Sequence, residues 1–320
     1  PHEVEAFNTK GAIIRTPIKG QSGLVEVNSK GLHGSLSACS PSEAQPKDYD
    51  LVVLAMQEPQ YGSTEVRDLL TRVAAAKKPA MSIMNMPPLT YLARIPGLDV
   101  AALRNCYLAP EVWDSLDPEL MTLCSPDPQA FRPPEEDVNV LQVRLPTNFK
   151  SAAFARASDT LILAELQKSI EEARFALPDG SEIELPVKLK VHPSVFVPLA
   201  KWAMLLAGNY RCVQAEEMRP IKDAVHSDLA ATREVYTWVV DLCIALGGNG
   251  ADFVPFEKYA DAAMSLGSPS SAARALAAGA KNIERVDKLV QQIGLSLGRK
   301  NANIDATVAL VDQWLAKNRA

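Results

Sequence analysis

The distribution of apolar and polar positions divides the chain into two parts. Up to about residue 190, short apolar runs alternate with stretches in which apolar residues recur at helical spacing. Beyond that point helical spacing prevails. Strands that alternate with helices are typical of α/β domains, whereas sustained helical periodicity is typical of an all-α domain. The pattern therefore predicts an α/β domain over residues 1–190 and a helical domain over residues 191–320.

The clearest strand is Asp50–Met56, whose unbroken apolar run is expected of a strand buried on both faces of a parallel sheet. A helix over Ser63–Ala76 follows, and then a strand over Ala80–Met86 that ends before Pro87. A strand–helix–strand order with short loops favours parallel pairing. We therefore expect a Rossmann-type, mostly parallel sheet.

The remaining apolar runs predict further elements. Strands are expected over Glu3–Phe7, Ile13–Ile18, Leu24–Val27, Cys106–Ala109, Leu120–Cys124, Val138–Leu145 and Ser181–Leu189. Helices are expected over Thr160–Phe175, Val195–Val213, Asp228–Leu246, Phe256–Met264, Ser270–Gly279, Asn282–Leu297 and Ala306–Lys317.

The composition argues against several classes of protein. Hydrophobic residues make up 47% of the 320 positions and charged residues 22%, which is ordinary for a globular protein. A net charge of −5 and the lack of a basic run argue against a nucleic-acid surface, and no apolar run has membrane-spanning length. Five cysteines and four histidines are scattered without paired spacing. We therefore expect reduced thiols, no metal site and a cytoplasmic location.

No phosphate-binding loop is visible in the sequence. The chain contains neither GxGxxG nor GxxxxGK[ST], the patterns that cradle phosphates between a strand and a helix. In a dinucleotide-binding fold this loop precedes the second strand, and Glu3–Phe7 is the first strand predicted here. Either a further strand–loop–helix unit lies ahead of Pro1 or the fold has lost it, and we expect the former.

The largely apolar segment Val191–Asn209 lies at the junction of the two predicted domains, a common place for ligand sites. It carries Lys201 and, eight residues later, Asn209, which would face the same way on a helix. A junction site would bring both residues to a ligand. The alternative is an ordinary core helix whose lysine extends to water.

The order of these features resembles the ketopantoate reductase (2-dehydropantoate 2-reductase) family, which joins a Rossmann domain to a helical domain like that of 6-phosphogluconate dehydrogenase. The resemblance runs from His2 to the end of the chain. It rests on Asp50–Met56 as the family's fourth strand, Ser82–Met86 as its strand ending in Gln-Asn-Gly, Lys201 and Asn209 as the first and last members of its Lys-xxx-Asn-xxx-Asn helix, Val239–Gly247 as the helix ahead of its last bundle, Ser268–Ser270 in place of Lys-Ser-Ser, and Ala278–Glu284 in place of Gly-Arg-x-Thr-Glu.

Three positions depart from the family pattern. Gln57 stands where a lysine is usual, and Leu205 replaces the middle asparagine of the helix. The family's glutamate aligns without gaps on Asn282, although a shift of two residues places Glu284 there. Because Leu205 would leave a polar substrate group unpaired, at roughly 1–3 kcal/mol, we expect a smaller or more apolar substrate than ketopantoate.

The resemblance implies hydride transfer from NADPH to a 2-oxo acid. It implies Lys201 as general acid, since a partly buried lysine stabilises the forming alkoxide and supplies its proton. Asn8 and Lys10 would lie at the ribose 2′-phosphate, where a neutral and a basic residue favour NADP over NAD. The complete set of implied residues is catalytic Lys201, Asn282 and Glu284, substrate-binding Asn85, Asn209 and Ser270, and cofactor-binding Asn8, Lys10, Met56, Gln57 and Asn85.

These polar residues also have ordinary structural roles. Asn85 can end its strand, Asn209 can end its helix, and Ser270 is a natural helix N-cap. Asn8 and Lys10 can be plain turn residues.

Two other functions are compatible with the sequence. Opine dehydrogenases share this two-domain plan and use a histidine near a His-Pro step, here His192, to join a 2-oxo acid to an amino acid. A reductase-like protein without activity would also explain Gln57, Leu205 and Asn282. The alanine- and leucine-rich helices fit a core and equally a homodimer interface. We expect a small-molecule substrate and neither a nucleic-acid nor a membrane partner.

Overall fold

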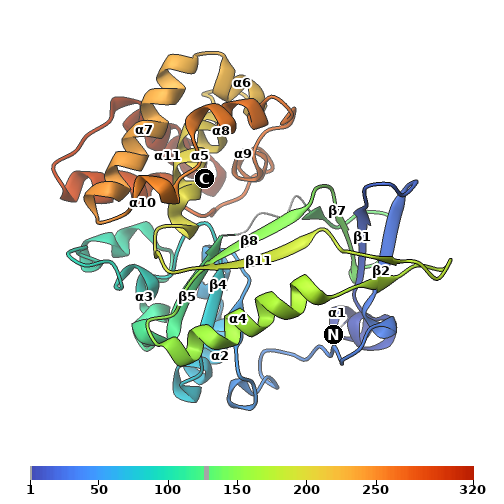
Figure 1. Cartoon of the computed structure of the whole chain (residues 1–320). Helices are drawn as coiled ribbons and strands as arrows, with labels where there is room; N and C mark the ends of the chain where they lie inside the picture. Colours follow the sequence, from blue (N-terminus) through green and yellow to red (C-terminus); the bar gives the residue numbers. More distant parts are fainter. Residues whose placement is uncertain (1, 126–129) are drawn as a thin grey trace.

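The computed structural model of the protein describes residues 2–125 and 130–320 (Figure 1). The strands are β1 (Ile13–Pro17), β2 (Leu24–Asn28), β3 (Val52–Leu54), β4 (Ala80–Ile83), β5 (Met121–Ser125), β6 (Ala130–Phe131), β7 (Val140–Val143), β8 (Thr147–Ala152), β9 (Phe175–Ala176), β10 (Glu182–Ile183) and β11 (Val187–His192). The α-helices are α1 (His2–Lys10), α2 (Thr64–Ala76), α3 (Leu89–Leu92), α4 (Ala157–Glu172), α5 (Lys201–Met204), α6 (Ile221–His226), α7 (Leu229–Ala245), α8 (Phe256–Ala263), α9 (Ser271–Ala277), α10 (Val286–Ser296) and α11 (Ala302–Arg319).

Five strands form the central sheet, in the order β11-β8-β5-β4-β3. Strands β3, β4 and β5 run parallel, β8 is antiparallel to β5, and β11 is parallel to β8. Neighbouring residues of β4 face separate cores, because Ala80 belongs to the core that includes Leu70 of α2, whereas Met81 belongs to the one that includes Leu163 of α4. Apolar layers thus cover both faces of β4. The edge strand β3 is covered on one face only, since Val53 is 44% exposed, so the expectation that this strand is buried on both faces is wrong.

A second sheet of four strands, in the order β2-β1-β7-β6, stands beside the central one (Figure 1). In it, β1 is antiparallel to β2 and parallel to β7. Strands β9 and β10 form a separate antiparallel pair. The predicted α/β class is confirmed, with strands of both directions in each of the two larger sheets.

One predicted strand, Glu3–Phe7, is wrong because this segment belongs to the helix α1. Its first turn carries Glu3 and Glu5 and its last residue is Lys10, so these charges complement the helix dipole. Five residues of weak alternation do not separate a strand from a short helix.

A second predicted strand, Cys106–Ala109, is also wrong. A 3₁₀-helix ends at Cys106, and bends follow it. The N–H of Leu108 donates to the carboxylate of Glu58 at 2.8 Å, so a side chain takes the place of a neighbouring strand. The predicted strand Ser181–Leu189 is divided into β10 and the beginning of β11.

Residues 198–320, all of which the structure describes, form helices and turns apart from one isolated bridge between Val213 and Met218. The predicted helices that correspond to α7, α8, α9 and α11 are confirmed. The predicted helix that corresponds to α4, in the α/β part of the chain, is confirmed as well. The predicted helix Val195–Val213 is a series of shorter turns that includes α5 and a π-helical turn, η8 (Leu205–Asn209). Helix α10 begins at Val286, later than the predicted start at Asn282.

One continuous apolar core joins the two halves of the chain. It contains Leu54 of β3, Met86 after β4, Trp202 of α5 and Val239 of α7, all of them buried. Full burial of such side chains contributes about 1.5–3 kcal/mol each. Polar groups at the seam between the halves are therefore enclosed by packed side chains rather than bathed in water.

Among the glycines of the helical half, Gly208 of η8 is the one against which a neighbouring side chain packs most closely. Its replacement therefore tests the packing of the helical core. A Cβ atom there would lie 2.2 Å from Oη of Tyr259 and 3.1 Å from Cγ2 of Val225. We expect Gly208→Ala to lower the free energy of unfolding by about 1–3 kcal/mol, the usual effect of overpacking. Urea unfolding measures this, with Gly267→Ala as the control, because nothing lies within 4 Å of a Cβ at that position. Equal effects of the two substitutions would contradict this account.

Candidate functional site at the seam

The candidate site begins where the parallel strands β3 and β4 end. Gln57 follows β3 by three residues and is exposed, and Asn85 follows β4 by two residues and is half-buried. Adjacent parallel strands bring their carboxyl ends to the same edge of a sheet, which is where α/β proteins bind ligands. The predicted residues Met56, Gln57 and Asn85 are therefore brought together at one edge.

The helical half contributes Glu284 to this edge. Oε1 of its carboxyl group accepts a hydrogen bond from the main-chain N–H of Glu58 at 3.4 Å. The carboxyl group also accepts hydrogen bonds from the Asn85 side chain and the Met86 N–H. Glu284 thus touches the residues that follow both strands.

Glu58 is a second carboxyl group at the same place. Its side chain is only 3% exposed, and it accepts the N–H groups of Leu108, at 2.8 Å, and Ala109. It lies in the 3₁₀-helix η3 (Glu58–Gly62), which Gln57 begins by donating its N–H to Oε1 of Gln60 at 2.9 Å. Glu58 was not predicted from the sequence, because its burial and its contacts with Leu108 and Ala109 come from a segment distant along the chain.

Burial changes the protonation of both carboxyl groups. Desolvation raises the pKa of Glu58 to about 7, against the hydrogen bonds from Leu108 and Ala109 that favour its charged form. Desolvation likewise raises the pKa of Glu284 to about 7, with a smaller contribution from the negative charge of Glu58 and against the hydrogen bonds from the Glu58 N–H, the Asn85 side chain and the Met86 N–H. The site therefore carries carboxyl groups that exchange protons near neutral pH.

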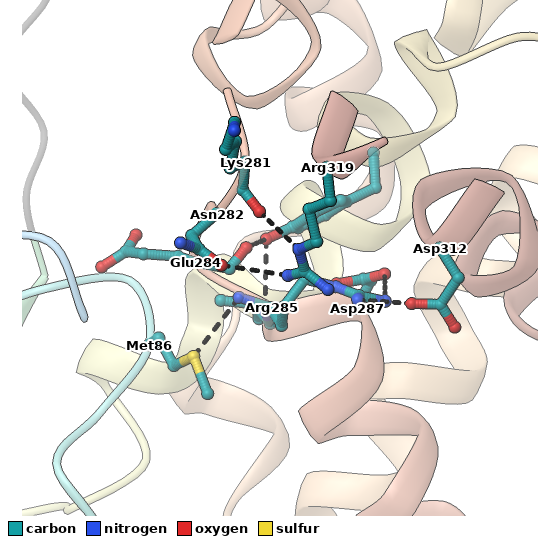
Figure 2. A network of polar contacts seen from close by, with 10 residues as sticks. Met86, Lys281, Asn282, Glu284, Arg285, Asp287, Asp312 and Arg319 are labelled. Carbon is teal, nitrogen blue, oxygen red and sulfur yellow. Dashed lines mark hydrogen bonds and ion pairs between the residues drawn. The ribbon is translucent and has the colours of Figure 1, made fainter. Parts of the chain in front are cut away.

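A buried ion pair holds the chain on which Glu284 lies. Arg285 donates to both carboxylate oxygens of Asp287, at 2.9 Å each, and to Oδ1 of Asp312 on α11 at 2.5 Å. Asp287 is fully buried. Burial alone would lower the pKa of Arg285, but its hydrogen bonds and charge interactions with the two aspartates raise it overall, so the guanidinium stays charged. Figure 2 shows the Glu284 side chain extending away from this ion pair.

Further hydrogen bonds fix the main chain around Glu284. The hydroxyl of Tyr210 donates to the Glu284 carbonyl and accepts the N–H of Val286. The N–H of Arg285 donates to the sulfur of Met86 at 3.3 Å (Figure 2). These contacts also explain why α10 begins at Val286 rather than earlier.

Asn282 and Glu284, the two candidates for the family's glutamate, lie in different surroundings. Asn282 is exposed, and its Oδ1 accepts a hydrogen bond from Arg319 at 3.0 Å (Figure 2). Glu284 lies at the seam with Glu58 and Asn85. The position reached by the two-residue shift is therefore the one that joins the cluster.

Lys201 lies ahead of the π-helical turn η8, and Asn209 is the last residue of that turn. Lys201 is half-buried at the start of α5 and interacts electrostatically with the thiol of Cys124. Eight residues of α-helix would turn two side chains about 80° apart. The π turn takes up one extra residue and reduces this divergence to roughly 20°. The next residue, Trp202, donates its indole N–H to the Asn85 carbonyl at 3.2 Å, which ties α5 to the strand edge.

Ser270 has the structural role given as its alternative. It is the N-cap of α9, where its hydroxyl accepts the N–H of Ala273 at 3.2 Å and donates to the Asn209 carbonyl at 2.7 Å. It is 2% exposed. Its hydroxyl thus serves the packing of η8 against α9.

The placement expected for Asn8 and Lys10 requires a correction. Both lie in α1 and not at the end of a strand. The Asn8 side chain pairs with the main-chain N–H and C=O of Ala38, at 2.8 Å each, and Lys10 pairs with Asp137 at 2.5 Å. Because the segment that carries Asn8 and Lys10 is a helix and not a strand, it gives no structural support for placing these residues at a ribose 2′-phosphate.

His192 ends β11. Its Nε2 atom is buried and has no hydrogen-bond partner among the described residues. Burial lowers the pKa of His192, and the positive charges of Lys150 and Lys190 lower it further. The imidazole is therefore a neutral group at physiological pH.

Other features of the chain lie apart from this seam. A groove of about 390 Å³ is lined by Ile18, Lys19, Pro146, Asn148, Ile183, Glu184, Leu185, Pro186 and Lys188, none of which was predicted for the site. Across residues 2–125 and 130–320, no helix is long and apolar enough to cross a membrane. The same residues contain no group of three or more His, Cys, Asp or Glu side chains that could hold a metal ion.

The same architecture occurs in solved proteins. A PanE/ApbA family ketopantoate reductase from Ralstonia eutropha JMP134 matches with a TM-score of 0.65 and 15% identity, over 100% of this chain and 90% of its own. A 2-dehydropantoate 2-reductase from Methylococcus capsulatus matches with a TM-score of 0.66 and 12% identity, over 99% and 88%. The chain has the fold of the ketopantoate reductases. D-mandelate dehydrogenase in complex with NADH and anilino(oxo)acetate matches with a TM-score of 0.62 and 11% identity, over 100% and 89%.

The ketopantoate reductase fold confirms the resemblance inferred from the sequence at the level of architecture. No family model and no curated protein matches the chain. Identities of 11% to 15% establish the fold alone, so the roles of individual residues depend on their geometry.

The buried carboxyl group of Glu58 should make stability depend on pH. Its pKa in the folded protein, about 7, lies above its ordinary value of 4.5, so the folded state binds more protons between these values. Its contribution to stability is complete below about pH 4.5 and is lost as pH rises through about 7, by roughly 3 kcal/mol in all. Glu58→Gln cannot titrate, so its free energy of unfolding relative to the wild type should be higher at about pH 8 than at about pH 5. Urea unfolding at both pH values tests this, and a difference that does not change with pH would contradict it.

The Arg285 ion pair yields a prediction of its own. Arg285→Met leaves the Asp287 carboxylate buried without its partner, so we expect a loss of about 3–5 kcal/mol in the free energy of unfolding. Adding Asp287→Asn removes the unpaired charge and should restore part of the loss. Urea unfolding of the single and double variants measures both effects. A loss below about 1 kcal/mol in the single variant would show that the ion pair does not hold this segment.

Proposed function

We propose that the protein reduces a small 2-oxo acid to a 2-hydroxy acid with hydride from NADPH. The observation that carries this proposal is the meeting of Glu284 with Asn85 and the carboxyl ends of β3 and β4. The ketopantoate reductase fold supports the proposal, because the solved proteins that share it include a ketopantoate reductase and a D-mandelate dehydrogenase in complex with NADH and anilino(oxo)acetate.

The strand edge fits the nicotinamide end of the cofactor. Gln57 offers an exposed amide and Asn85 a half-buried one, and these are suitable partners for a carboxamide. When bound, the reduced nicotinamide supplies the hydride. The preference for NADPH over NADH follows the family resemblance, since Asn8 and Lys10 no longer support it by position.

Residues of the chain would bind and orient the substrate and would supply the proton. Lys201 would stabilise the negative charge that forms on the carbonyl oxygen and would donate a proton to that atom. Asn209, turned to nearly the same face by η8, would orient the substrate by hydrogen bonds. Leu205, half-buried in the same turn, would favour a substrate without a polar group at that position. Of the two candidate positions, we assign the acidic role to Glu284 and not to Asn282.

One specific observation supports the alternative function of an opine dehydrogenase. The buried, unpartnered Nε2 of the neutral His192 is suited to accept or donate a proton. That function would require an amino acid as co-substrate. An inactive, cofactor-binding protein is the third possibility, and it would show no turnover at all.

Steady-state oxidation of NADPH tests the proposed function with a panel of 2-oxo acids of increasing side-chain size. We expect turnover with small or apolar 2-oxo acids, and a fall of about 10²-fold or more in kcat for Lys201→Met, with NADPH binding retained. Lys281→Met changes an exposed lysine and is the matched control. Turnover that depends on an added amino acid and on His192 would favour the opine reading. The absence of turnover in the wild type with every acid would overturn the proposal.

A further inference from the structure

The two strands at one side of the central sheet, β8 and β11, have one apolar face and one basic face. Phe149 of β8 and Leu189 of β11 pack in the apolar core that α4 covers (Figure 1). Side chains alternate along a strand, so the residues between these lie on the opposite face. The parallel register sets the residues of that face side by side in three pairs: Asn148 and Lys188, Lys150 and Lys190, and Ala152 and His192.

The three lysines of this face lie close together and reach solvent. Lys188 and Lys190 are exposed and Lys150 is half-buried. Neighbouring strands lie about 4.8 Å apart and alternate residues of one strand about 6.6 Å apart, so the three flexible side chains can reach one small anion. Burial lowers the pKa of His192, and the charges of Lys150 and Lys190 lower it further, whereas Asp252 of the helical half raises it. The influence of both lysines on His192 agrees with their place on the same face.

Few carboxylates oppose these positive charges. Lys188 forms an ion pair with Glu184 at 3.7 Å, but both side chains are about half exposed, so the pair is weak. In the part of the chain that the structure describes, neither Lys150 nor Lys190 forms an ion pair. The face is thus a local concentration of positive charge in a chain whose net charge is −5. Such a face attracts anions.

The basic face continues into the groove of about 390 Å³ at the beginning of β8 and β11. Asn148 and Lys188, the first pair of the row, form part of the groove lining, together with Lys19 from the segment after β1. The rest of the lining is apolar apart from Glu184: Ile18, Pro146, Ile183, Leu185 and Pro186. A volume of this size and an apolar wall with a few polar groups are typical of small-molecule sites.

We propose that this face and the adjoining groove bind a small molecule in which a phosphate group is attached to an apolar chain. The phosphate would lie between Lys150, Lys188 and Lys190, because ammonium groups are common partners of phosphate and three of them suit a dianion better than a single carboxylate. The apolar chain would lie in the groove, where it is removed from water. This site lies apart from the seam and does not depend on the proposed reductase function.

Isothermal titration calorimetry of the full chain with octyl phosphate, below its micelle-forming concentration, tests the inference. We expect saturable binding that is tighter than that of inorganic phosphate, which cannot fill the groove. The double variant Lys150→Gln, Lys190→Gln should raise the Kd for octyl phosphate about tenfold or more, because charge-assisted hydrogen bonds are lost. The matched control, Lys168→Gln with Lys258→Gln, removes the same charge from exposed positions of α4 and α8 and should leave the Kd unchanged.

A second variant tests the groove separately from the lysines. Leu185→Ser shortens a half-buried apolar side chain of the lining. It should raise the Kd for octyl phosphate several-fold, because less apolar surface is buried, and should leave the Kd for inorganic phosphate unchanged. The lysine double variant, in contrast, should weaken the binding of both.

Several results would overturn the inference. They are the absence of saturable binding of octyl phosphate, a Kd for it that is unchanged in the lysine double variant or in Leu185→Ser, and equally tight binding of octyl glucoside, whose head group is uncharged. Sedimentation with phosphatidate vesicles without binding of dispersed octyl phosphate would place the interaction at a lipid surface and would also overturn it. These outcomes do not bear on the reduction of a 2-oxo acid, which is tested by NADPH oxidation.

Discussion

The ion pair between Arg285 and Asp287 holds in place the segment of the helical half that contacts the edge of the sheet. A buried charge pair is costly to form and far more costly to break, so the segment that carries it has one stable position. Arg285 is bound to the start of α10 and to α11, and its neighbour in sequence, Glu284, is directed to the other side. The helical half thereby delivers a carboxyl group to the edge of the sheet.

Apolar packing and polar contacts cooperate at this seam. The core that runs from β3 through Trp202 to α7 excludes water, and this exclusion is what moves the pKa of Glu58 and Glu284 toward neutrality. The indole of Trp202 serves both purposes, since it fills the core and donates to the Asn85 carbonyl. The same packing that stabilises the fold therefore prepares the electrostatics of the site.

The sequence predicted the elements whose burial pattern repeats over many residues. The helix Asp228–Leu246 corresponds to α7, because helical spacing is sustained over its whole length. The predicted strand Asp50–Met56 contains β3, which is limited to Val52–Leu54, since an apolar run alone does not define where a strand ends. Glu3–Phe7 failed because so short a segment carries no clear period. The predicted helix from Asn282 failed at its start because contacts with Tyr210 and Met86, distant in sequence, determine the conformation there.

The sequence predicted the candidate site unevenly for similar reasons. Asn85 and Gln57 follow recognisable parallel strands, so their meeting could be anticipated from topology. The choice between Asn282 and Glu284 required the structure, since one side chain is exposed and the other lies at the seam. Glu58 was missed because its importance depends on burial and on the Leu108 and Ala109 N–H groups, which no local pattern reveals.

The proposed function requires a nicotinamide cofactor to bind at the edge of β3 and β4, next to Trp202. The most direct test is energy transfer from tryptophan to NADPH during a titration of the full-length protein. We expect saturable transfer that falls strongly in Trp202→Phe and persists in Trp314→Phe, because Trp314 lies on α11 and donates to the Gln214 carbonyl. Saturable transfer that is unaffected by Trp202→Phe would place the cofactor elsewhere, and no binding of NADPH or NADH would rule out the reductase function.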